Sequence, residues 1–90
     1  MPKQQKTRKR IEIGKYLVSD PNICHGQLTF KGTRVMVRSV LEAFRRGESW
    51  DEIRQGWPTV PPEAIQEALA LATERLVKSV ETEAAMKEVA

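Results

Sequence analysis

The stretch that decides the fold reads DPNICHGQLTFKGTR and spans residues 20–34. Its Asp-Pro pair indicates a turn, because proline fixes its own φ and keeps the preceding residue out of the helical region. The alternation of Leu28, Thr29 and Phe30 is typical of a half-buried strand. Glycines on either side of it permit positive φ at the turns. The stretch therefore predicts a small β-ribbon, with strands near residues 16–18, 28–30 and 34–36.

Helical patterning begins directly after the ribbon. Val37, Val40 and Phe44 recur at the spacing of one helix face, and Gly47 lies where a terminating glycine belongs. We therefore expect a first helix over about residues 37–46.

A capping box indicates a short second helix. Ser49 precedes Glu52 by three residues, the spacing at which each side chain binds the other residue's backbone N–H. Trp50, Ile53 and Trp57 follow as its inner face. A helix this short has little stability of its own, so we expect the two tryptophans to anchor it in the core.

The third and longest helix is expected from Pro62 to at least Lys78, because proline favours the first helical position. Its predicted core stripe consists of Ile65, Leu69, Ala72 and Leu76. Further apolar residues predict a face for a second copy or another partner, and they are Ala64, Ala68, Leu71, Val80 and Ala84. The alternative is that this helix packs on two neighbours within its own domain.

Together these patterns predict a mainly α fold, in which a three-helix, helix-turn-helix-like core is preceded by the β-ribbon. A chain of 90 residues suffices for one domain, which we place at residues 11–79. Residues 1–10 are predicted to be a disordered basic arm. Residues 80–90 are predicted to be a frayed helical extension or to fold on a partner.

The positive charge of the chain is concentrated at its N-terminus. The total is +3, from 15 basic and 12 acidic residues, but residues 1–10 hold five of the basic residues and no acidic one. The other ten basic and 12 acidic residues therefore carry a net charge of −2. A basic arm neutralises phosphates, and a solubilising tail is the competing interpretation. The candidate nucleic-acid contacts are Lys3, Lys6, Arg8, Lys9, Arg10, Arg34 and Arg38.

Charge argues against DNA reading by the third helix. In a helix-turn-helix unit the start of the second helix reaches base edges in the major groove. That position here offers Glu63, Gln66 and Glu67, which do not neutralise phosphates. The fold outline suggests DNA binding, whereas the charge of this helix opposes it.

The adjacent Cys24 and His25 do not predict a metal or catalytic centre. Structural zinc needs four ligands and catalytic zinc three, and the chain has one cysteine and one histidine. We expect no catalytic residues, no metal and no cofactor. A single cysteine fits a reducing cytoplasm, and no apolar run reaches the length of a membrane span, so a cytoplasmic protein without membrane contact is predicted.

The central stretch also resembles a known family. The matching residues are Asp20, Pro21, Ile23, Cys24, Gly26, Gly32, Thr33 and Arg34, followed by Gly47, Ser49, Glu52, Ile53 and Pro58. The pattern is similar to the bacterial family called domain of unknown function 433 (DUF433), from about Tyr16 to Leu76. The resemblance implies a helix-turn-helix-like fold and an antitoxin role beside PIN-like ribonuclease toxins. It supplies no established catalytic residues.

The resulting hypothesis is a non-enzymatic, homodimeric antitoxin-like module that binds and inhibits a PIN-like ribonuclease. The metal site that the resemblance implies in such an enzyme would be blocked by arginine or by occlusion. Two alternatives stay open. One is a DNA-binding transcriptional regulator, and the other is a dimeric protein-interaction module of unknown role.

Overall fold

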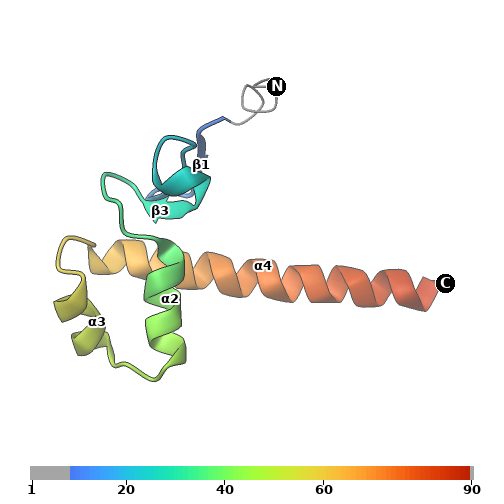
Figure 1. Ribbon diagram of the computed structural model, residues 1–90. Coiled ribbons are helices and arrows are strands. Elements are labelled where there is room, and N and C mark those ends of the chain that lie inside the picture. Colours follow the sequence, from blue (N-terminus) through green and yellow to red (C-terminus); the bar gives the residue numbers. More distant parts are fainter. Residues whose placement is uncertain (1–8, 90) are drawn as a thin grey trace.

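The structure is a computed structural model that describes residues 9–89. Lys3, Lys6 and Arg8 of the predicted basic arm lie outside the described residues. Over the described range the chain forms a small antiparallel sheet followed by three helices, which confirms the predicted fold class (Figure 1). The elements are β1 (Ile11–Ile13), β2 (Leu17–Ser19), a 3-10 turn η1 (Cys24–Gly26), β3 (Leu28–Phe30), α2 (Val37–Arg45), α3 (Trp50–Gly56) and α4 (Pro62–Val89).

The sheet is a meander in the order β1-β2-β3, and one of its strands differs from the prediction. Ile11 pairs with Ser19 and Leu17 pairs with Phe30, so residues 11–13 supply the third strand. Residues 34–36 were predicted in that role, but only Met36 forms an isolated bridge, to Thr29. The reason is local. The Thr33 hydroxyl accepts the N–H of Val35 at 3.0 Å and curls the chain toward α2 before a strand can form.

The central element is α2, which contacts β3, α3 and α4 (Figure 1). It spans nearly the predicted residues and buries Val37, Val40 and Ala43. The fully buried apolar residues around it come from β2, β3, all three helices and the segment between α3 and α4. They form one cluster of Leu17, Phe30, Val37, Val40, Ala43, Ile53, Val60, Ala64, Ile65 and Ala68.

The second helix, α3, begins as predicted, but its tryptophans do not anchor the core. The Ser49 hydroxyl accepts the N–H of Glu52 at 3.2 Å, and Glu52 accepts the N–H of Ser49 at 2.7 Å. Within α3 only Ile53 is buried. Trp50 is 38% exposed and packs edge-on against Phe44, while Trp57 is half-buried. Trp57 packs against the core cluster from the end of the helix, whereas Trp50 contacts Phe44 at the start of the helix.

The third helix, α4, divides into a packed first part and a projecting second part (Figure 1). Ala64 and Ala68 are 1% and 2% exposed, so their assignment to a partner face was wrong: they belong to the chain's own core. Ala72 and Leu76, predicted as core, are instead exposed. The physical reason is that neighbours cover only the first turns of α4, and the helix then continues past them. Residues 80–89 are part of the helix. That this extension folds on a partner stays a prediction.

One carboxylate ties the sheet to α4. Glu67 accepts the backbone N–H of Lys15 at 2.8 Å and that of Tyr16 at 2.7 Å, in the turn between β1 and β2. These two hydrogen bonds hold the pKa of Glu67 below its ordinary value, because they stabilise the ionised carboxylate. Gly14 is the first residue of this turn and has φ +64°, and a Cβ there would lie 2.6 Å from the Glu67 carboxyl carbon.

We expect Gly14→Ala to destabilise the protein more than Gly32→Ala. Both glycines have positive φ, +64° and +77°, so both substitutions incur a left-handed backbone cost of about 1–2 kcal/mol. Only the methyl group at residue 14 displaces Glu67, since nothing lies within 4 Å of a Cβ at residue 32. Thermal unfolding followed by circular dichroism measures the difference. Equal losses would show that the Glu67 contact does not stabilise the fold.

We also expect the contribution of Glu67 to depend on pH. A lowered pKa means that the ionised form is favoured in the folded state, so the stabilisation is present above pH 4.5, the ordinary value, and is lost as pH falls through the folded pKa. Urea unfolding of wild type and Glu67→Gln from about pH 6 to about pH 3 tests this. The stability gap between the two proteins should close toward low pH. A gap that stays constant would contradict the assignment.

Candidate functional site

The main candidate surface is the projecting part of α4, residues 72–87, which we call distal α4. Every side chain in it is exposed, and the helix extends away from the rest of the domain (Figure 1). Leu76, Val77 and Val80 are 65%, 47% and 53% exposed. At about 100° of rotation per residue, these three residues and Ala84 fall within about 100° around the helix axis, so they lie along one side of the helix. We call these four residues the stripe.

The stripe agrees only in part with the predicted partner face. Val80 and Ala84 were predicted and are exposed on distal α4. Leu71 was also predicted, but it is half-buried and packs against the core. Leu76 and Val77 were missed, although one sequence signal was available. The apolar positions of the helix shift around its axis after Leu71, which is expected where a helix leaves one packing partner and faces another.

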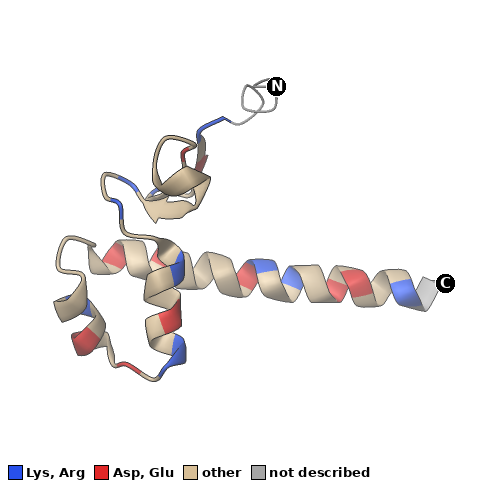
Figure 2. Cartoon of the chain, viewed as in Figure 1, with Lys and Arg blue, Asp and Glu red and all other residues tan. Residues whose placement is uncertain are grey.

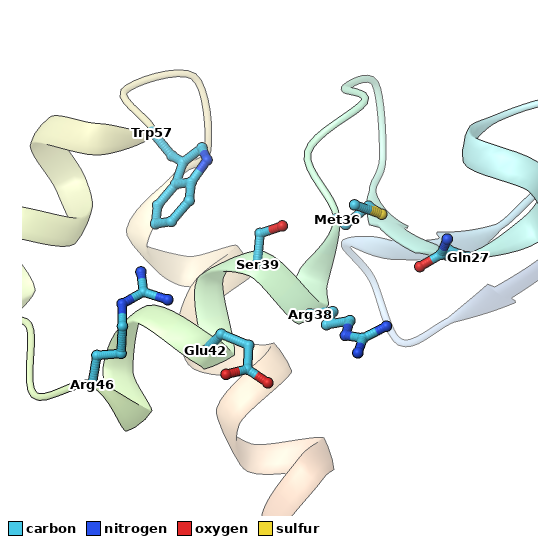
Figure 3. A pocket seen from close by; sticks show the side chains of 7 residues that line it. All are labelled: Gln27, Met36, Arg38, Ser39, Glu42, Arg46 and Trp57. Carbon is cyan, nitrogen blue, oxygen red and sulfur yellow. The ribbon is translucent and has the colours of Figure 1, made fainter.

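A second candidate surface is a shallow hollow of about 500 Å³ beside α2. Its lining residues are Gln27, Met36, Arg38, Ser39, Glu42, Arg46 and Trp57 (Figure 3). Arg46 is directed toward the indole of Trp57, whereas Arg38 extends toward the side of Gln27 (Figure 3). Among these residues the sequence predicted a binding role for Arg38 alone, because the hollow is formed by segments that are separated along the chain.

A carboxylate limits the positive charge of this hollow. Glu42 lies between Arg38 and Arg46 on α2 and accepts hydrogen bonds from Arg45, with a shortest contact of 2.8 Å. Arg45 is the main cause, and the two other arginines are lesser causes, of the lowered pKa of Glu42. Arg46 also forms an ion pair of 3.0 Å with Glu48. The hollow therefore offers an indole and two partly balanced guanidinium groups.

The predicted nucleic-acid residues that the structure describes are not gathered into one patch. Arg10 is 3.0 Å from Asp20 and 3.3 Å from Glu12, while Lys9 is exposed beside it. The N–H of Asn22 and the guanidinium of Arg10 lower the pKa of Asp20. Arg34 and Arg38 are exposed on the loop before α2 and on α2 itself. Figure 2 shows these basic positions separated along the ribbon and interrupted by acidic ones.

The start of α4 carries acidic side chains, and one of them already accepts hydrogen bonds from another part of the fold. Glu63 and Gln66 are exposed there, while Glu67 is engaged by the turn between β1 and β2. The buried Ala64, Ile65 and Ala68 alternate with them. This leaves a narrow polar face with no basic side chain among residues 62–68.

The cysteine and the histidine lie in a tight turn. Cys24 and His25 both have positive φ, 50° and 58°, and the Cys24 thiol lies 3.5 Å from the carbonyl oxygen of Arg34. Cys24 is half-buried and His25 is exposed. Among residues 9–89, no three His, Cys, Asp or Glu side chains are placed to share a metal ion. Within the same range, no helix has both the length and the apolarity that crossing a membrane requires.

The fold and these surfaces define a small, mainly helical module with an antiparallel ribbon and a projecting C-terminal helix. Residues 17–72 match the family model described as Protein of unknown function (DUF433), and the chain belongs to this family. The chain matches no curated protein and no solved structure. The matched segment begins at Leu17, after β1, and ends one residue after Leu71, so most of distal α4 lies beyond it.

Proposed function

We propose that this chain is a non-enzymatic, cytoplasmic antitoxin-like module that binds and inhibits a PIN-like ribonuclease. The observation that carries the proposal is distal α4, whose aliphatic stripe has no packing partner among the described residues. Covering the apolar side of this projecting helix would stabilise it, because most helical stability in proteins comes from packing of an amphipathic face. Amphipathic helices of this kind bind apolar grooves on other proteins.

The nature of the partner rests on the family resemblance, and the mode of inhibition rests on the stripe. A helix that occupies a groove on a ribonuclease excludes RNA by occlusion and requires no chemistry from this chain. The predicted insertion of arginine from the basic arm stays a second mechanism. A second copy of this chain, bound through the same stripe, is the competing occupant.

Co-expression with a PIN-like ribonuclease encoded by an adjacent gene tests the proposal. We expect the full-length chain to restore growth of cells that express the ribonuclease and to block cleavage of RNA by the purified enzyme. An unrelated ribonuclease serves as the control and should stay active. Failure to bind and inhibit the neighbouring ribonuclease, or the absence of such a neighbour, would contradict the proposal.

The hollow beside α2 favours nucleic-acid binding as a second candidate function, because Arg38, Arg46 and the Trp57 indole line it together. Titrating labelled duplex DNA and single-stranded RNA tests this with two variants. Deleting residues 1–10 removes five positive charges and should lower nonspecific affinity, whereas Arg38→Gln should act only if the hollow takes part. If neither variant changes the affinity, neither the arm nor Arg38 contacts nucleic acid.

A further inference from the structure

The stripe on distal α4 is bordered by acidic residues. At 3.6 residues per turn, Glu74 and Glu81 lie seven residues apart along one border, and Glu83 lies on the other. Arg75 and Lys78 are turned to the opposite side of the helix. All five side chains are exposed. The apolar stripe is therefore flanked by carboxylates, and Lys87 is the one basic residue of distal α4 that lies on the same side, next to Glu83.

We propose that distal α4 occupies an apolar groove of a different protein whose two edges carry lysine or arginine. The inference rests on the proposed function, and it identifies which part of the ribonuclease is bound. An enzyme that binds RNA needs basic side chains along its RNA-binding surface, because phosphate neutralisation dominates that affinity. The glutamates along the stripe are complementary in charge to this basic surface. They would be repelled by the acidic residues that hold a divalent metal ion in such an enzyme.

Charge disfavours a second copy of this chain as the occupant. When two identical helices pack stripe against stripe, the border with Glu74 and Glu81 meets the same border of the second helix in an antiparallel pair and the Glu83 border in a parallel pair. Like charges at these flanking positions oppose association. Lys87 is the basic residue closest to the stripe, and its ammonium lies 3.6 Å from Glu83 of the same helix.

An anionic membrane is also a poor occupant for the stripe. Helices that lie on such membranes place basic residues beside their apolar side, because the lipid headgroups are negative. Distal α4 has glutamates in that position. A basic-edged protein groove is therefore the occupant that both the apolar and the charged residues of distal α4 favour.

The test uses two synthetic amphipathic helices of about three heptads each. Both peptides carry the same leucine stripe, one with lysines at the flanking positions and one with glutamates. Fluorescence anisotropy with the full-length protein should give at least about tenfold tighter binding of the lysine peptide, an advantage that shrinks between about 50 and 300 mM salt. Equal binding of both peptides, or binding of neither, would overturn the inference.

Two variants locate the effect on the borders of the stripe. The double substitution Glu81→Gln with Glu83→Gln should remove most of the lysine preference. Glu63→Gln is the matched control, because it removes an exposed carboxylate from the packed part of the same helix and should retain the preference. Full preference in the double variant would overturn the inference.

Two further outcomes would identify a different occupant of the stripe, and two others separate this inference from the proposed function. A wild-type mass of twice 10.2 kDa that falls to the monomer in Val80→Glu would show that a second copy covers the stripe. Binding to anionic vesicles would indicate a membrane, and either result overturns the inference. If the double variant loses the lysine preference but still inhibits the ribonuclease fully, the inference fails alone. If the lysine preference holds and the neighbouring ribonuclease is not inhibited, the proposed function fails alone.

Discussion

Replacing Phe30 by alanine should lower the free energy of unfolding by about 3–5 kcal/mol, the largest single effect expected on stability. Phe30 is 1% exposed at the end of β3, the strand that contacts α2, so truncating it leaves a cavity between the sheet and the helices. For a domain of this size the loss corresponds to a fall of roughly 15–30 °C in Tm, which calorimetry or circular dichroism measures. Because this loss approaches the total stability of a small domain, Phe30→Leu serves as a milder second variant.

The matched comparison for Phe30 is Trp50. Trp50→Ala removes a larger side chain that is 38% exposed and whose ring contact is the edge-on pair with Phe44. We expect a loss of about 1 kcal/mol, the magnitude typical of such an aromatic pair. An equal loss for Trp50 and Phe30 would contradict the core assignment and favour the tryptophan-anchored core that the sequence suggested.

Placing a charge in the middle of the stripe should abolish partner binding without unfolding the protein. Val80 is 53% exposed, so Val80→Glu should leave the Tm nearly unchanged. In the complex, the new carboxylate would be buried against apolar side chains, and affinity for the neighbouring PIN-like ribonuclease should fall at least about thirtyfold. Isothermal titration calorimetry measures this loss.

Thr82→Glu is the control for this substitution. Thr82 is exposed, close to valine in shape and located on the opposite side of distal α4 from Val80. The same charge introduced there should leave the affinity within about threefold of wild type, as expected for a residue at the edge of an interface. Equal losses at the two positions would mean that the stripe is not the binding surface.

The residues of the candidate surface on α4 were partly predictable, and the wrong assignments have one cause. Val80 and Ala84, which were predicted on a partner face, are exposed, whereas Ala64 and Ala68 proved to be core and Leu76 proved to be exposed. Helical periodicity shows which residues share a side, but it does not show how far along a helix the neighbouring elements reach. The hollow near Trp57 was not predictable, because it depends on where the end of α3 meets α2.

The sequence by itself determined the features that depend on residues a few positions apart. The capping box of Ser49 and Glu52, the start of α4 at Pro62 and the strand at residues 28–30 are all present, since each depends on backbone geometry or hydrogen bonds within about one turn. Tertiary structure alone decided that residues 11–13 complete the sheet, that Glu67 holds the turn near Gly14, and that α4 leaves the core after Leu71. These outcomes depend on which distant segments compete for the same hydrogen-bonding edge or apolar surface. Local propensity does not encode that competition, and packing of the whole chain resolves it.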